Sequence, residues 1–308
     1  MQTLQPNPTF CGVPYQPDPV GLEAEVAILG AAHGTPYRSG RPSHAANAPG
    51  AIRRALGWYS ANPEHLDFDT GLPVFGANRV VDCGDVVGSL VDGAANRAAI
   101  REATGAILGA GVVPLLLGGD DSTPIPFLEA FGGVYPDLTV VQIDAHIDWR
   151  HQVAGVTHGY SSTMRRASEM AHVRHIVQLG ARGPGSARQA ELDHARAWGA
   201  RIFSARDLHR DGVAPALAAV PEGAPVVISL DVDGLDPALV PGVILPAFGG
   251  IQYQQALDII HGVAARGRIV GTTAVEYVPE RDSTGSGAQA VARLLSNVIA
   301  MLRSGTDA

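Results

Sequence analysis

Short apolar runs rich in Val, Ile and Leu recur along the chain and alternate with Ala-rich segments. The runs occupy residues 26–31, 112–119, 138–145, 175–182, 226–233 and 269–276. Because almost every position in them is apolar, they are typical of strands buried on both faces of a sheet. The pattern predicts a central sheet that is covered on both sides.

The segments between these runs have helical spacing, most clearly at residues 94–111, 187–200 and 253–267. Strand and helix therefore alternate, and such units join by right-handed crossovers into a parallel sheet. We expect an α/β fold, a three-layer sandwich with a mainly parallel central sheet and helices on both faces.

The chain has 308 residues, of which 46% are hydrophobic and 17% charged. This composition supports one large core, so we expect a single domain over residues 1–308. Residues 1–25 would form an N-terminal extension that packs on the domain or on an oligomer partner. Gly/Pro-rich stretches at 32–50 and 235–251 predict long loops, and the second follows an Asp-rich strand end, where open parallel sheets bind ligands.

The net charge of −8 disfavours nucleic acid or an anionic membrane as a partner and favours a cationic small molecule. Only two cysteines occur, Cys11 and Cys83, so neither a disulfide framework nor a Cys-rich zinc site is expected. No basic leader and no apolar stretch of about 18 residues are present. We expect a cytoplasmic protein with reduced thiols.

Three predicted strands run directly into acidic clusters, at residues 115–122, 140–148 and 227–237. Residues two apart on an extended chain point the same way, so Asp144, His146 and Asp148 share one face and Asp231 and Asp233 share another. A lone Asp at a strand end is more often a cap or a turn residue. So many carboxylates in one crevice repel each other unless cations neutralise them or their pKa values rise. The clusters therefore indicate bound metal.

The acidic clusters belong to a series of motifs: GGDDS (118–122), DAHID (144–148), HG (158–159), SLDVDGLDP (229–237) and EYVPERD (276–282). With these motifs in this order, nearly the whole chain resembles the ureohydrolases, a family that includes arginase, agmatinase and guanidino-acid hydrolases. Residues 10–15 and 40–56 resemble the agmatinase branch. The resemblance implies an arginase-like fold and assembly into a homo-trimer or hexamer.

The resemblance also implies a ligand set for two divalent metal ions. Asp144 and Asp231 would bridge the ions, Asp148 would complete the shell of one, and His146 and Asp233 would complete the shell of the other. An oxygen-rich site with few imidazoles suits Mn²⁺, and Ni²⁺ is the alternative. The sequence leaves the choice of metal open.

One ligand position departs from the family's pattern. Where ureohydrolases have G-G-D-H-S, with a His that binds the first metal, this chain has Asp121. Asp is a competent oxygen ligand, but a more negative site holds the proton of a bound water more firmly. We expect weaker hydroxide formation, an altered metal preference or loss of the first metal. His33 is a candidate for a compensating nitrogen ligand.

The resemblance implies a metal-dependent amidinohydrolase, in which hydroxide attacks a guanidinium carbon and the products are an amine and urea or a substituted urea. Asp148 would donate a proton to the departing amine, His158 would shuttle protons, and Glu276 would bind the guanidinium. Agmatine, guanidino acids, guanidine, alkylguanidines and biguanides all remain candidate substrates.

Two alternatives belong to other classes. Asp121 is compatible with a weakly active or inactive paralogue that serves as the structural subunit of a hetero-oligomer with a homologous chain. The retained array of carboxylates and histidines argues against this reading. A single-zinc deacetylase shares a related architecture, but the paired D-A-H-x-D and S-x-D-x-D motifs favour two metals.

Overall fold

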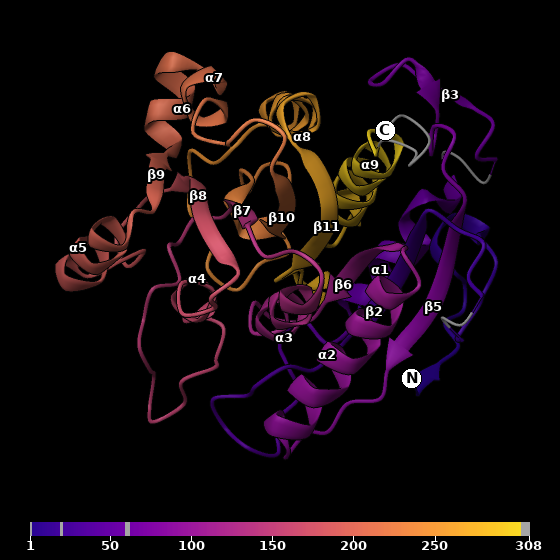
Figure 1. Ribbon diagram of the computed structural model, residues 1–308, viewed down its shortest axis with the longest axis horizontal. Coiled ribbons are helices and arrows are strands. Elements are labelled where there is room, and N and C mark those ends of the chain that lie inside the picture. Colours follow the sequence, from indigo (N-terminus) through magenta and orange to yellow (C-terminus); the bar gives the residue numbers. More distant parts are fainter. Residues whose placement is uncertain (1, 19–20, 59–61, 303–308) are drawn as a thin grey trace.

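The computed structural model describes residues 2–18, 21–58 and 62–302, and its centre is a nine-stranded sheet (Figure 1). Within this sheet every strand pairing is parallel except that of β1 with β5. From one edge to the other the strands are β1 (Thr3–Leu4), β5 (Val80–Val86), β2 (Val26–Ala31), β6 (Val113–Gly118), β11 (Arg268–Val275), β10 (Pro225–Asp231), β7 (Leu138–Ile143), β8 (Val173–Ala181) and β9 (Arg201–Ser204). Two further strands, β3 (Leu66–Asp67) and β4 (Leu72–Pro73), form a separate antiparallel pair. The expected mainly parallel sheet is confirmed.

Helices cover both faces of the sheet, as the apolar runs predicted (Figure 1). One core contains side chains of α1 (Ala48–Ala55), α6 (Ala205–Asp211), α7 (Ala214–Leu217), α8 (Tyr253–Arg266) and α9 (Ser286–Ala300). The other contains side chains of α2 (Gly93–Gly109), α3 (Pro124–Ala130), α4 (Thr163–Ala167) and α5 (Gln189–Trp198). In β2, Val26 and Ile28 enter the first core and Ala27 and Leu29 the second, which is the alternation of a strand buried on both faces.

The six expected strands and three expected helices are all present, with small shifts at their ends. Five strands among the described residues were not expected: β5, β9 and the two-residue strands β1, β3 and β4. The sequence of β5, VVDCGDV, is interrupted by Asp82 and Asp85, which are neutralised by Arg53 of α1. The Arg53 guanidinium is fully buried, with Nε 2.9 Å from Asp82 Oδ2 and Nη1 2.5 Å from Asp85 Oδ1. A local pattern cannot show this ion pair, so the strand was missed.

The N-terminal segment contacts the sheet edge. Strand β1 pairs with β5, the Phe10 side chain is fully buried in the first core, and the Phe10 N–H donates to Asp82 Oδ2 at 3.0 Å. Residues 1, 19 and 20 of the expected extension lie outside the described residues. Across the parts of the chain that the structure describes, no helix combines the length and the apolar character needed to cross a membrane.

Candidate metal centre

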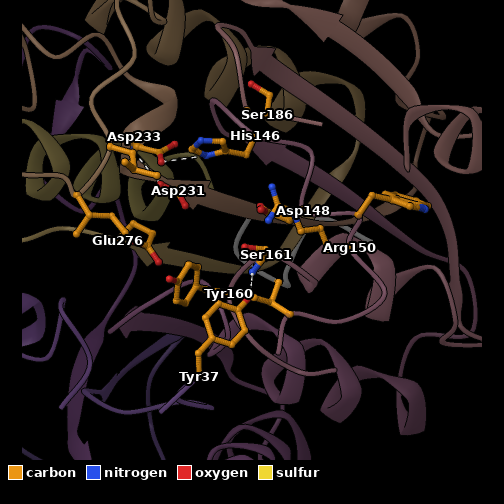
Figure 2. A pocket seen from close by; sticks show the side chains of 15 residues that line it. Tyr37, His146, Asp148, Arg150, Tyr160, Ser161, Ser186, Asp231, Asp233 and Glu276 are labelled. Atoms are coloured by element: carbon orange, nitrogen blue, oxygen red, sulfur yellow. Dashed lines mark hydrogen bonds and ion pairs between the residues drawn. The ribbon is translucent and has the colours of Figure 1, made fainter. Parts of the chain in front are cut away.

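The central strands β6, β11, β10 and β7 are parallel neighbours, so their carboxyl ends lie together at one edge of the sheet. Asp121, Glu276, Asp231 and Asp144 lie at or just beyond these four ends, and each is at most 4% exposed. Figure 2 shows Asp231, Glu276 and three further site residues, His146, Asp148 and Asp233, around one pocket. Buried carboxylates of this density need a compensating positive charge or shared protons.

The acidic side chains form two overlapping groups of potential ligands. In one group, ligand atoms of Asp121, Asp144 and Asp231 all lie within 4.8 Å of one another, and in the other the same holds for Asp144, His146 and Asp233. Asp144 is common to both groups, and Asp231 belongs to the first. The geometry suits two neighbouring cations that share Asp144.

Asp121 provides a test of whether the site fits a cation. Both of its carboxylate oxygens are buried and have no hydrogen-bond partner within the described residues, while its backbone carbonyl accepts a hydrogen bond from Thr163 Oγ1. Burial raises the pKa of Asp121, and the nearby Asp148 and Glu276 carboxylates raise it further. A buried, unpartnered carboxylate is costly, and a bound cation is the group that would offset this cost.

His146 lies between two of the acids. Its Nδ1 is 3.2 Å from Asp233 Oδ2 and 3.3 Å from Asp144 Oδ1. Burial opposes protonation of His146, but the hydrogen bond to Asp233 and the charges of Asp233, Asp148 and Glu276 together outweigh it and raise the pKa of the imidazole to about 9. Burial raises the pKa of Asp144, and Asp148 adds to the effect. Because ligands must lose their protons to bind a metal, a cation would compete with these protons.

A buried amide pair orients two of the carboxylates. Gln142 Nε2 donates to Asp144 Oδ2 at 2.6 Å and to Asp148 Oδ2 at 2.9 Å, while Gln178 Nε2 donates to Gln142 Oε1 at 2.6 Å. Asp148 itself has the left-handed backbone φ of 44°, a strained conformation for a residue with a side chain. Gln142 was not among the expected site residues. Its position two residues before Asp144, on the same face of the strand, is the signal that would have indicated it.

Gln142→Leu is expected to weaken metal binding and to lower kcat/KM about 10- to 100-fold, because residues that orient metal ligands have effects of this size. Calorimetric metal titration and turnover assays measure both effects. Thr139→Val is the matched control, since Thr139 lies on the same strand and its buried hydroxyl has no partner in the described structure. Equal behaviour of the two variants would contradict the orienting role.

Glu276 closes the pocket on another side. Its φ is 68°, so the chain turns sharply after β11, and Oε1 accepts a hydrogen bond from the Asp121 N–H at 2.8 Å. Oε2 lies 2.5 Å from His44 Nε2. Tyr160 stacks beside them, with ring centroids 4.4 Å from Tyr37 and 5.3 Å from His44. Tyr37, His44 and Tyr160 lie on loops, and no sequence motif indicated their role.

His158 and His33 lie outside both ligand groups. His158 does not line the pocket of Figure 2, and its Nδ1 lies 2.9 Å from Thr157 Oγ1. Burial, together with the charges of Arg97 and Arg166, lowers the pKa of His158. Its shuttle role stays a prediction. Burial lowers the pKa of His33, and the charge of Asp120 opposes this shift. Because His33 belongs to neither ligand group, the structure gives no support to a compensating nitrogen ligand.

The fold and the two ligand groups define a metal-dependent α/β enzyme whose site lies at the carboxyl edge of a parallel sheet. The model of the arginase family matches residues 24–301. The chain therefore belongs to the arginase family.

Individual relatives agree with this assignment. The chain is 31% identical to a guanidinobutyrase of Pseudomonas aeruginosa, covering 96% of this chain and 92% of the relative. It is also 31% identical to a mitochondrial agmatinase of Gallus gallus, covering 94% and 84%. Among solved structures, proclavaminate amidinohydrolase from Streptomyces clavuligerus superimposes with a TM-score of 0.83 at 27% identity and covers 96% of both chains.

Proposed function

We propose that the chain hydrolyses a C–N bond of a guanidino compound at a binuclear metal centre and releases an amine with urea or a substituted urea. The observation that carries this proposal is the unpartnered, buried Asp121 carboxylate, which lies in one ligand group beside a second group that shares Asp144. Membership of the arginase family supports the same reaction class.

The residues present fit two divalent cations. Asp121, Asp144 and Asp231 offer only oxygen ligands, Asp148 adds a further carboxylate beside them, and the second group adds the imidazole of His146. This donor set favours Mn²⁺, with Ni²⁺ as the alternative. Such ions supply a bound water of lowered pKa as the nucleophile.

The protein's own groups bind and orient the substrate. Glu276 is buried and lines the pocket, and its carboxylate accepts charge-assisted hydrogen bonds from the guanidinium. Glu276 Oε2 is also hydrogen-bonded to His44 Nε2. Asp148, held toward the ligand groups by Gln142, donates the proton that the departing amine needs. The tyrosine pair of Tyr37 and Tyr160 shields this end of the pocket from water.

The test is to load the purified protein separately with Mn²⁺ and Ni²⁺, determine metal content, and measure urea and amine release from guanidino acids, agmatine, guanidine, alkylguanidines and biguanides. Turnover with two ions per chain supports the proposal. No turnover with at most one ion overturns it. Recovery of a homologous chain in a pull-down would then favour the structural-subunit alternative.

We also propose a cytoplasmic homo-trimer or hexamer. Membership of the arginase family, for which the sequence resemblance implied such an assembly, supports this proposal. The molar mass from light scattering of the same preparation tests the assembly.

Asp121→His is expected to move the metal preference toward Ni²⁺, by about tenfold in the ratio of Ni²⁺ to Mn²⁺ affinity, because imidazole suits Ni²⁺ better than carboxylate does. Competition calorimetry measures the ratio. Asp120→Asn is the control, since this neighbouring carboxylate is buried outside both ligand groups and bonds to Ser122. An unchanged ratio in Asp121→His would show that residue 121 does not bind the metal.

A further inference from the structure

Charges of both signs line the pocket in Figure 2, with Glu276 on one side and with Asp148 and Arg150 on the other. The metal site of the pocket is acidic, with Asp148, Asp231, Asp233 and Glu276. The single arginine that lines the pocket is Arg150, which lies on the side away from Glu276 in this view. A cavity of about 240 Å³ admits a small molecule. A pocket with this charge distribution is complementary to a ligand with a cationic head and an anionic tail.

Arg150 is available to bind an anion. Its Nε lies 3.9 Å from Glu191 Oε1, which is beyond hydrogen-bond range, and this is its closest ionic contact within the described residues. Glu191 is itself held at the start of α5, where it accepts a hydrogen bond from the Arg188 N–H at 2.8 Å. The Arg150 side chain is 31% exposed, so its terminal nitrogens can reach a ligand in the pocket.

The surroundings of the pocket add positive charge. Tyr37, Tyr160 and Val153 line both this pocket and an adjoining cavity, which is also lined by Arg38 and Arg41. The one carboxylate lining that adjoining cavity is Asp120, which already accepts hydrogen bonds from Ser122. Among the described residues lining these two cavities, Asp120 is the one carboxylate outside the metal site, and three arginines, Arg38, Arg41 and Arg150, oppose its charge.

Arg182, which lines a third neighbouring cavity, is committed to the fold. Its guanidinium donates to the backbone carbonyls of Gly180, Asp233, Gly234, Leu235 and Ala247. Arg182 therefore stabilises the loop that follows β10. Because its donors are used in this way, Arg150 is the arginine that can bind a substrate anion.

Part of the pocket is apolar. Val153, Ile244 and Leu245 line it together with the aromatic rings of Tyr37 and Tyr160. Such a wall packs against methylene groups. The pocket thus offers carboxylates for a guanidinium, an apolar wall for a short hydrocarbon chain and Arg150 for an anion.

We propose that the substrate is a guanidino acid, with its guanidinium at Glu276 and its carboxylate at Arg150, and not a guanidino amine such as agmatine. This inference rests on the proposed hydrolysis of a guanidino compound. The guanidinobutyrase and the agmatinase named above are equally identical to this chain, so identity does not choose between them. The charge of Arg150 distinguishes the two substrates, because it attracts the carboxylate of a guanidino acid and repels the ammonium group of agmatine.

The test compares kcat/KM of the Mn²⁺-loaded protein for 4-guanidinobutyrate, butylguanidine and agmatine. The wild type is expected to prefer the acid over agmatine by at least about tenfold. Arg150→Met is expected to lower kcat/KM for the acid roughly 10- to 100-fold, since hydrogen bonds to charged groups have energies that correspond to this range. The kcat/KM of Arg150→Met for butylguanidine, which has no carboxylate, should differ from that of the wild type by less than about twofold. Arg150→Glu should reverse the preference toward agmatine.

Arg188→Met is the matched control. The Arg188 Nη1 lies 3.8 Å from the same Glu191 carboxylate, but Arg188 is exposed and does not line the pocket, so its loss should leave all three values unchanged. The dissociation constant of 4-guanidinobutyrate, measured by calorimetry, provides a readout that does not depend on turnover.

The outcomes separate the two proposals. Turnover of guanidino compounds without preference for the acid, or with equal effects of Arg150→Met and Arg188→Met, overturns the role of Arg150 and leaves the hydrolase intact. If no guanidino compound is bound or cleaved by the metal-loaded protein, both proposals fail.

Discussion

Asp144→Asn is expected to abolish binding of both metal ions and to lower kcat/KM by roughly 10³-fold or more. Asp144 is the residue common to the two ligand groups, so its charge acts on both cations. Loss of an electrostatic contribution of about 4 kcal/mol corresponds to three tenfold steps in rate. In Asp144→Asn, an Nδ2 group in the place of Oδ2 would face the Gln142 Nε2 donor with a second donor, and the hydrogen bond between the two side chains would be lost.

Metal content and turnover of Asp144→Asn should be compared with those of Asp233→Asn. Asp233 belongs to the second group only, so this variant is expected to keep one ion per chain. If Asp144→Asn also keeps one tightly bound ion, Asp144 does not serve both sites.

Metal-free protein is expected to lose stability as the pH rises from about 5 to 9, whereas metal-loaded protein is not. Burial raises the folded-state pKa values of Asp121, Asp144 and Asp231. Folding therefore favours their protonated forms, and this contribution is lost as the pH rises through the folded pKa values. His146 acts in the same direction: its stabilising contribution is complete below its ordinary pKa of 6.5 and is lost as the pH passes about 9.

Thermal unfolding in EDTA and in excess Mn²⁺ across this pH range measures the effect. At a hundredfold excess of free metal over Kd, each site contributes about 2.7 kcal/mol. The Tm shift is about 2–4 °C per kcal/mol for domains of 150–250 residues and lies at the low end for a longer chain, so two sites should separate the Tm values by roughly 10 °C near pH 8. Asp233, whose pKa is lowered, affects stability only at more acidic pH. Parallel pH profiles with and without metal would contradict the expectation.

The sequence predicted the architecture because its signals are local. Continuous apolar runs mark strands buried on both faces, and β2 shows the consequence, with alternate residues in two cores. Asp144, His146, Asp231 and Asp233 were also identified from local motifs, and the structure brings them together because parallel strands end at the same edge.

Features that depend on distant residues were missed. Strand β5 was not recognised because Asp82 is compensated by Arg53 of a preceding helix, 29 positions away. His44 and Glu276 are 232 positions apart, and nothing near His44 in the chain indicates the contact. Arg150 illustrates a third case. It lies just after the DAHID motif in the sequence, but only the structure shows that it lines the same pocket as the distant Glu276.

The backbone at Asp148 and Glu276 has a consequence for protein engineering. Both residues hold left-handed conformations that glycine adopts freely, at a cost on the order of 1–3 kcal/mol each. At these two positions, substitution by glycine is therefore expected to raise thermal stability and to lower turnover. A mutant library screened for thermal survival alone would enrich glycine there and select durable proteins without activity, so each round of such a screen needs an assay of product release.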